Sequence, residues 1–304
     1  ANGAAITFAD ADFTFGRWNA DTETIDAASG SDIDAVEVTA RCTVPLAFGA
    51  AFGKSTTAVA ARATARCASD PSPGIIGLNS IQMQNGAMTD SYRSTDGAYA
   101  FATHRTNGDI ASNGSIQLTN SSQVYGDAHR LSGQTVNSAS RIVSPGQVLT
   151  MSTPLSYPVP TIPPGTTNLG NYTRQGTGST TLTAGNYRAT KFEIKDQHKL
   201  TISGVVTVYV NGDVTFQNQA KTMGNPPGNF RIRVVSTGHT LKIQDGASVE
   251  ADIAAPGVNV TLQNQAQLYG SVVGKTLIVQ DQAEAHFDES IVSGSGSTGT
   301  TLVR

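Results

Sequence analysis

Seven stretches of the chain repeat one short pattern: two apolar residues flanking a third residue, then polar residues rich in Gln, Asn and Asp, then a second apolar alternation. Self-similarity at roughly fixed spacing indicates a stack of coils, in which each repeat buries its apolar face against its neighbours. The stretches begin at Ile81, Ile116, Phe192, Val214, Leu241, Val260 and Leu277. We therefore expect a solenoid. This architecture favours a structural or binding function over catalysis.

The last five repeats start 22, 27, 19 and 17 residues apart, which suits one turn of a parallel β-helix with loops of variable length. Alternation within a strand places Val260 and Leu262 inward and Thr261 outward. The leucine framework of leucine-rich repeats is missing. We predict a mainly β protein, a right-handed parallel β-helix preceded by a small α+β segment, with the hand taken from the usual hand of parallel crossovers.

Asn and Asp suit the corners of such coils because they tolerate left-handed backbone and bond to nearby peptide groups. Asn218, Asp245, Asn264 and Asp281 occupy the corner in four successive repeats. We expect them to align into a polar ladder beside a row of Gln residues. The ladder is interpreted as scaffold, with a ligand-binding face as the alternative.

Composition favours a surface protein. Charged residues make up 14% of the chain, against about 25% in typical soluble domains. The net charge of −3 and the scattered Lys and Arg residues argue against a nucleic-acid partner. No apolar run suits a membrane span and no signal peptide begins at Ala1, so a leader or anchor is expected upstream.

We divide the chain into an N-terminal α/β domain (1–69), a β-helix domain (74–290) and a flexible Gly/Ser-rich tail (291–304). A proline-rich stretch at 151–170 is predicted to cross the solenoid, because proline cannot donate to a sheet ladder. Its apolar residues are expected to be buried: Leu155, Tyr157, Val159 and Ile162.

The N-terminal domain is expected to contain a hairpin at 13–18 and 24–25, a strand at 35–42, a helix at 46–52 and a strand at 57–67. Cys42 and Cys67 lie near the C-terminal ends of their strands. They can therefore lie opposite each other on neighbouring strands only if those strands run parallel. A bridge between them would contribute about 3 kcal/mol in an extracellular protein. The alternative is two unpaired thiols in a cytosolic protein.

The segments 12–18, 35–41 and 44–48 resemble the post-membrane region of TadG-like proteins from bacterial tight-adherence (Flp-type) pilus loci. Those proteins carry a membrane helix before this region, so Ala1 looks like the point at which an upstream anchor was removed. The rest is similar to the bactofilin-style β-helical domain often fused behind it, on segments such as 107–110, 124–127, 203–213, 254–256, 268–270 and 286–289. The resemblance implies an extracellular, pilus- or envelope-associated scaffold without catalytic residues.

Enzyme and metal chemistry find little support in the pattern. Polysaccharide-active β-helices need converging carboxylates, whereas Asp288 and Glu289 are adjacent and point to opposite sides of a strand. The five histidines show no zinc-type spacing. His286 and Asp288 are interpreted as a capping pair. We predict no catalytic, metal or cofactor site.

Two function hypotheses remain. In the first, the chain is a structural protein or adhesin whose open β-helix ends, or whose C-terminal strand-like piece, promote assembly with itself or with other pilus or envelope components. In the second, the flat polar ladders bind glycans or another surface.

Overall fold

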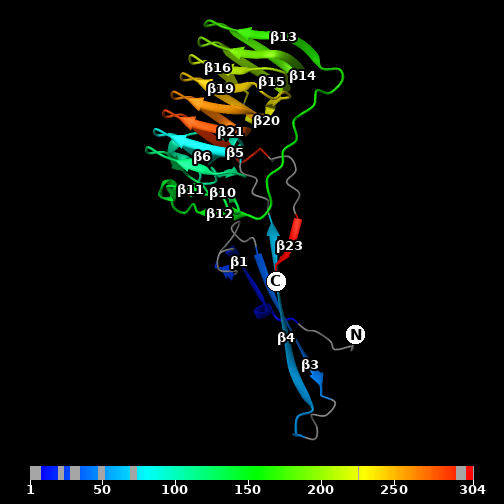
Figure 1. Cartoon of the computed structure of the whole chain (residues 1–304). Helices are drawn as coiled ribbons and strands as arrows, with labels where there is room; N and C mark the ends of the chain where they lie inside the picture. The colour runs from blue at the N-terminus through cyan, green and yellow to red at the C-terminus, as the bar shows by residue number, and fades with distance from the viewer. Residues whose placement is uncertain are drawn as a thin grey trace. The chain divides into compact units, whose positions relative to one another are not determined.

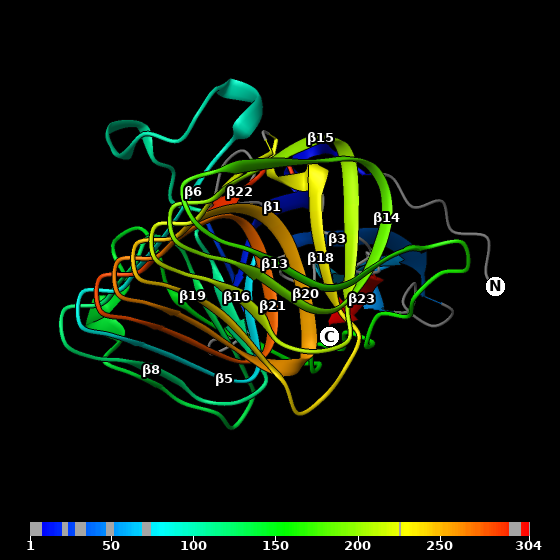
Figure 2. The same cartoon turned by 90° about the horizontal axis from the view of Figure 1, so that it is seen from above.

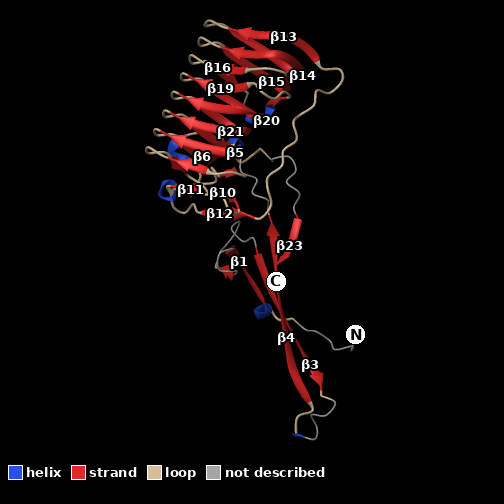
Figure 3. Cartoon of the chain, in the orientation of Figure 1, coloured by secondary structure: helices blue, strands red, loops and turns tan. Residues whose placement is uncertain are grey.

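The computed structural model describes residues 8–19, 24–27, 35–46, 52–68, 74–224, 226–291 and 299–303. Contacts divide the chain into two compact units, one of residues 1–72 and 295–304 and one of residues 73–294 (Figure 1). Both units consist of strands with short 3-10 turns (Figure 3). Among the described residues, no helix has the length and apolar character needed to cross a membrane.

The first unit is an antiparallel sheet with the strand order β2-β1-β3-β4-β23. Its strands are β1 (Phe13–Asn19), β2 (Thr24–Asp26), β3 (Ala35–Pro45), β4 (Thr56–Ala68) and β23 (Gly299–Val303). The predicted hairpin is confirmed, with Trp18 opposite Ile25. The predicted helix falls mostly on 47–51, outside the described residues. In the tail, which was predicted to be flexible, β23 pairs antiparallel with β4.

The predicted disulfide is wrong within this chain, because β3 and β4 pair antiparallel and not parallel. Cys42 lies opposite Val59, eight residues along β4 from Cys67. At about 3.3 Å per residue, that offset is roughly 26 Å, far beyond the reach of a bridge. Cys42 is a free, half-buried thiol.

The second unit is the predicted parallel β-solenoid; the hand of its coil stays a prediction. Its first strands are β5 (Ile75–Gln84), β6 (Met88–Tyr92), β7 (Ile110–Ser112), β8 (Ile116–Leu118), β9 (Gln123–Val124), β10 (Ala128–Leu131), β11 (Val136–Asn137) and β12 (Val148–Met151). The remaining strands are β13 (Thr167–Arg174), β14 (Ser179–Ile194), β15 (Lys199–Val210), β16 (Val214–Phe216), β17 (Lys221–Met223), β18 (Phe230–Val234), β19 (Thr240–Gln244), β20 (Ser248–Gln263), β21 (Gln267–Gln280) and β22 (Glu284–Asp288).

All seven repeat starts stack in one column, in the order Phe192, Val214, Leu241, Val260, Leu277, Ile81 and Ile116. The first repeat of the sequence therefore lies directly beside the last one. The chain enters the stack near its middle at β5, coils to one end at β12, crosses to the other end at β13 and coils back to β22 (Figure 1). We call the pairing of β5 and β6 with β21 and β22 the joint.

The coils wind around a common interior, as the view along the stack shows (Figure 2), and the buried apolar side chains form one large cluster there. Val260 and Leu262 point inward and are fully buried, as their alternation predicts. The largest buried side chains include Phe192, Phe216 and Phe230. Toward the β13 end, Tyr172 stacks on Phe192 with ring centroids 5.0 Å apart.

The proline-rich stretch runs along the outside of the solenoid from β12 to β13 (Figure 1). Asn113 holds it by two hydrogen bonds: its Nδ2 donates to the Leu155 carbonyl (2.9 Å) and its Oδ1 accepts from the Leu155 N–H (2.7 Å). Leu155 and Tyr157 pack on a small outer cluster around Ile76. Leu155 and Tyr157 are half-buried, whereas Val159 and Ile162 remain 40% and 38% exposed, so the expected burial of the apolar edge is only partial.

Candidate functional site

The corner residues form a single ladder along the solenoid. Asn218, Asp245, Asn264 and Asp281 all have left-handed backbone with φ of 55° or 56°, the conformation that Asn and Asp tolerate. The structure brings these four together and extends the column with Asp196, Asn85 and Asn120. We call these seven residues the corner ladder; Asp245 and Asp281 are half-buried and the other five are exposed to solvent.

Asn and Asp alternate through most of the corner ladder. The amide of Asn264 donates to Asp245 over 2.7 Å, and that of Asn218 donates to Asp196 over 2.8 Å. Alternation gives each carboxylate an amide donor and keeps like charges out of adjacent coils, where strands lie about 4.8 Å apart. The corner ladder therefore stabilises the stack with little charge repulsion.

A row of Gln side chains runs beside the corner ladder. Gln84 donates to Gln280 across the joint over 2.9 Å, and Gln244 donates to Gln217 over 3.2 Å. Two open pockets of about 490 and 520 Å³ lie along the corners. Their walls are polar amides and carboxylates, the chemistry of a surface that can hold hydroxyl-rich ligands.

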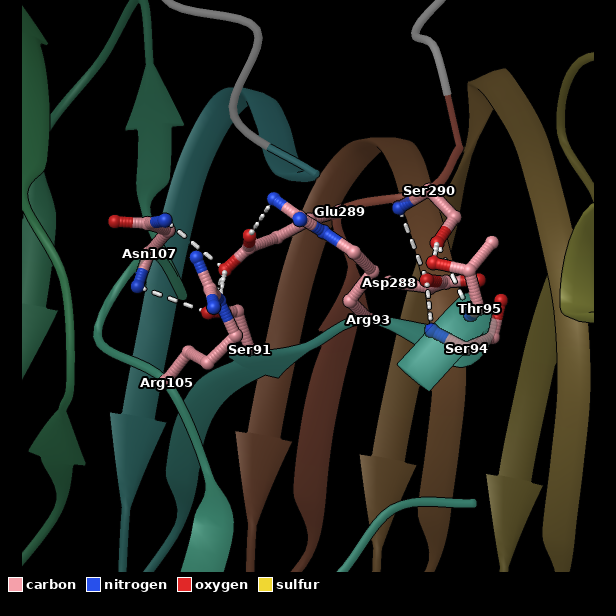
Figure 4. A network of polar contacts seen from close by, with 9 residues as sticks. All are labelled: Ser91, Arg93, Ser94, Thr95, Arg105, Asn107, Asp288, Glu289 and Ser290. Atoms are coloured by element: carbon pink, nitrogen blue, oxygen red, sulfur yellow. Dashed lines mark hydrogen bonds and ion pairs between the residues drawn. The ribbon is translucent and has the colours of Figure 1, made fainter. Parts of the chain in front are cut away.

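The joint carries a second polar network, drawn in Figure 4. The Glu289 carboxylate accepts hydrogen bonds from the Ser91 hydroxyl (2.8 Å), Arg105 Nε (2.8 Å) and the Asn107 amide (2.9 Å), with Arg93 at 3.5 Å. The donors come from the N-terminal coils and the acceptor from the end of the C-terminal coils. One carboxylate thus ties together segments more than 180 residues apart in sequence.

Asp288 and Glu289 serve different partners, as expected for adjacent residues on a strand. Asp288 is fully buried, and its Oδ1 accepts from the backbone N–H groups of Ser94 (2.9 Å) and Ser290 (3.0 Å). It therefore fixes the loop that follows β6. The capping pair predicted between His286 and Asp288 is wrong, because both ring nitrogens of His286 contact other carboxylates.

His286 is the centre of a buried ionic cluster at the joint. Its Nδ1 lies 2.6 Å from Asp90 Oδ1, and both side chains are 0% exposed. Its Nε2 lies 3.1 Å from Glu284 Oε2. The Tyr99 hydroxyl donates to the second oxygen of Asp90 over 2.6 Å, and the Tyr99 and Tyr269 rings lie against the imidazole.

The protonation of this cluster follows from its contacts. Burial alone would lower the pKa of His286, but the hydrogen bonds with Asp90 and Glu284 and their negative charges raise that pKa above its ordinary value. The hydrogen bond with His286 in turn lowers the pKa of Glu284. Burial raises the pKa of Tyr269 to about 12, so the phenol stays neutral. The cluster is therefore an imidazolium held between two carboxylates.

Acid and base groups are thus close together here, but Asp90 and His286 are closed to solvent. A substrate cannot reach them in this conformation, so their evident effect is to hold the two sets of coils together. Sequence reasoning missed this cluster because Asp90 and His286 are 196 residues apart. The available signal was charged residues at positions where the alternation predicts burial.

Comparison with protein families gives one match in each of the two units. Residues 1–65 match the family described as putative Tad-like Flp pilus-assembly. Residues 178–293 match a family described as a domain of unknown function, DUF7305. No curated protein and no solved structure shows significant similarity to the chain.

The DUF7305 match covers the coils from β14 through β22 and ends just beyond the joint. The pilus-assembly match covers the N-terminal sheet up to β4. A pilus-assembly segment joined to a β-solenoid fits a pilus-associated structural protein of the cell envelope. The chain is therefore similar to TadG-like proteins: its N-terminal residues match a Tad-like Flp pilus-assembly family, and a parallel β-solenoid follows them.

Proposed function

We propose that the chain is a non-enzymatic scaffold displayed outside the bacterial cell, and that its solenoid associates end to end with other copies or with other pilus components. The N-terminal segment supplies the link to the pilus machinery in this proposal. The solenoid supplies a rigid body whose surface is polar and low in charge. Adhesion to surfaces would be a consequence of displaying that body on a pilus.

The observation that carries the proposal is where the chain enters and leaves the stack. Strands β5 and β22 lie at the joint, and both end coils are internal segments of the chain (Figure 1). Among the described strands, β13 pairs only with β14, and β12 only with β10. Each end therefore presents strand edges with unpaired backbone groups, which favour addition of another strand.

Electron microscopy of the purified full chain, together with sedimentation over a range of concentrations, tests this proposal. We expect rods or filaments one solenoid wide and a sedimentation coefficient that rises with concentration. Charges at the two ends should block the association, because charged side chains, Lys above all, protect sheet edges. Suitable variants are Leu169→Lys in β13, at one end of the stack, and Leu149→Lys in β12, at the other end.

The matched control is Val205→Lys, which places the same charge on an apolar side chain that is 46% exposed and belongs to β15, a strand paired on both sides and one coil in from the β13 end. It should associate like the unmodified chain. Particles that stay monomeric at every concentration, or association that survives both end variants, would contradict end-to-end assembly.

A glycan-binding surface is the second candidate, favoured by the open pockets along the corner ladder. Amide and carboxylate groups repeated at the spacing of the coils match ligands with repeated hydroxyl groups. A glycan array probed with the full chain should give signals that Asn264→Ala and Asn218→Ala reduce. An empty array would remove this candidate and leave the scaffold proposal intact.

A further inference from the structure

Three successive strands near the β12 end are each preceded by a glycine and a polar residue. Gly108-Asp109, Gly126-Asp127 and Gly146-Gln147 each stand directly before a strand. Asp109 Oδ1 accepts the backbone N–H of Asp127 (2.7 Å), and Asp127 Oδ1 accepts that of Gln147 (2.8 Å). One oxygen of each carboxylate thus fixes the next coil.

A glycine is needed at Gly126 for this arrangement. A Cβ there would lie 2.6 Å from Asp109 Oδ1 and 2.7 Å from the Asp109 nitrogen, both too close for an ordinary contact. The glycine therefore leaves room for the Asp109 carboxylate between the two coils. The strand register sets Asp127 beside Asp109, because Ala128 pairs with Ile110.

His129 brings a third group to the same place. It follows Asp127 by two residues, so both side chains project from one face of the strand. Its Nε2 lies 3.7 Å from Asp109 Oδ2, too far for a hydrogen bond. His129 is only 9% exposed, and its buried Nε2 has no hydrogen-bond partner among the residues that the structure describes. Leaving a buried imidazole nitrogen without a hydrogen bond costs free energy. A ligand bound between this nitrogen and the neighbouring carboxylate would remove that cost.

The surroundings restrict access to water. His129 lies in register between Ala111 of β7 and Leu149 of β12. Ala111 is fully buried in the outer cluster on which Leu155 and Tyr157 of the crossing pack. The crossing therefore packs on the face of the sheet from which His129 projects, whereas Asp109 remains 30% exposed, so that a cation can reach the carboxylates from solvent.

We propose that Asp109, Asp127 and His129 bind a divalent transition-metal ion of the Zn²⁺ type. One ligand atom from each residue lies within 4.8 Å of the others. Two bonds of about 2.1 Å span about 4.2 Å, so small side-chain rotations bring all three atoms into a first coordination sphere. An imidazole with two carboxylates suits Zn²⁺ and related ions, whereas Ca²⁺ takes six to eight oxygens. A water molecule would complete the sphere.

Another Asp–His pair in the solenoid accepts a backbone N–H from the next coil but does not form a three-residue cluster. Asp213 Oδ1 also accepts a backbone N–H from the next coil, that of Thr240, over 2.9 Å. His239 Nδ1 lies 3.6 Å from that oxygen, but His239 is 43% exposed. No second carboxylate joins this pair within the described part of the chain. The pair therefore provides a matched control.

Isothermal titration of the full chain with Zn²⁺, after a chelator has removed bound metal, tests the proposal. We expect one ion per chain, with a dissociation constant in the micromolar range or below. Asp109→Asn keeps an acceptor for the Asp127 N–H but loses a ligand, and His129→Gln loses the imidazole. Each should weaken binding at least tenfold, while His239→Gln leaves it unchanged. Zn²⁺ should also raise the Tm of the unmodified chain but not that of His129→Gln.

Cobalt(II) substitution in the unmodified chain tests the ligand set without any variant. We expect d–d absorption bands from nitrogen and oxygen ligands, with no sulfur-to-metal charge-transfer band. A charge-transfer band would assign the ion to a cysteine and overturn the proposal. Absence of Zn²⁺ binding to the unmodified chain, equal loss in His239→Gln, or tighter binding of Ca²⁺ than of Zn²⁺ would overturn it as well.

Discussion

The joint and the serial coils between Phe192 and Leu277 share one kind of backbone pairing but differ in their side chains. The serial coils are linked at their corners by exposed amides and carboxylates, such as Asn264 and Asp245. The joint has such contacts too, but it adds a buried imidazolium between two carboxylates and a buried aspartate.

The difference follows from how each contact is formed. Successive coils are joined by short turns, so chain connectivity already brings the correct neighbours together. At the joint, coils separated by almost 200 residues must find each other among repeats with nearly identical apolar patterns. We infer that the buried ionic groups select this pairing, since mispaired coils would leave their charges uncompensated.

The largest effect is expected from His286→Ala. It leaves Asp90 and Glu284 buried or half-buried without their cation, and breaking a buried ion pair typically costs about 3–5 kcal/mol. Urea unfolding of the full chain should show a decrease of this size. The double variant His286→Leu, Asp90→Leu should lose less than His286→Ala. A loss below about 1 kcal/mol for His286→Ala would show that the joint needs no ionic selection.

The next effect concerns Glu289. Glu289→Ala removes one acceptor from Ser91, Arg105 and Asn107. Because hydrogen bonds to charged groups contribute about 1.5–3 kcal/mol, we expect the free energy of unfolding to fall by about 2 kcal/mol. Arg188→Ala, at an exposed position of β14, is the control and should change it by less than about 0.5 kcal/mol. Equal losses in the two variants would contradict the network's importance.

The joint should also respond to pH. The pKa of His286 is raised in the folded chain, so its contribution is complete below about pH 6.5 and is lost as the pH rises through the raised pKa. The pKa of Glu284 is lowered, so its contribution is present above about pH 4.3 and is lost as the pH falls through the lowered pKa. We expect the joint to be most stable between these limits.

Urea unfolding at a series of pH values measures this dependence. The unmodified chain should lose stability between neutral and alkaline pH, and His286→Gln should lack that decline. A decline of the same size in His286→Gln would assign the pH dependence to other groups.

The smallest effect is expected in the corner ladder. Asn264→Ala removes the hydrogen bond to Asp245 and places a Cβ-bearing residue without a local bond at φ 55°. We expect a loss of about 1 kcal/mol, because the left-handed region costs an ordinary residue about 1–2 kcal/mol. Asn264→Gly should recover part of this loss in thermal unfolding. A loss as large as that of His286→Ala would remove the distinction between the corner ladder and the joint.

Much of the solenoid could be predicted because each repeat carries its own information. The alternation of Val260 and Leu262 predicts which side chains point inward, and Asn264 predicts where the coil turns. The order of the coils could not be predicted, because Ile81 and Val260 begin repeats with the same pattern. Nothing local in those patterns says that the repeat at Ile81 stacks on the one at Leu277.

The wrong strand pairing and the missed side-chain cluster have different physical causes. The parallel pairing of β3 and β4 rests on the similar positions of Cys42 and Cys67 near the ends of their strands. Antiparallel pairing is the commoner arrangement, and it needs only a short connection. Asp109 and His129 show no metal-type spacing because metal motifs are recognised within one strand or helix. In a solenoid, neighbouring side chains come from positions one coil apart.

The central claim is that the first and last repeats form one continuous stack, and disulfide cross-linking tests it most directly. Gln84 and Gln280 are partners in the register of the joint, and Cα atoms on neighbouring strands lie about 4.8 Å apart, within bridging range. The variant Gln84→Cys, Gln280→Cys, with Cys42 and Cys67 replaced by Ser, should form a bridge within one chain on oxidation. Gln84→Cys with Gln263→Cys, one coil further away, should not. Equal bridging of the two pairs, or bridges only between chains, would contradict the account.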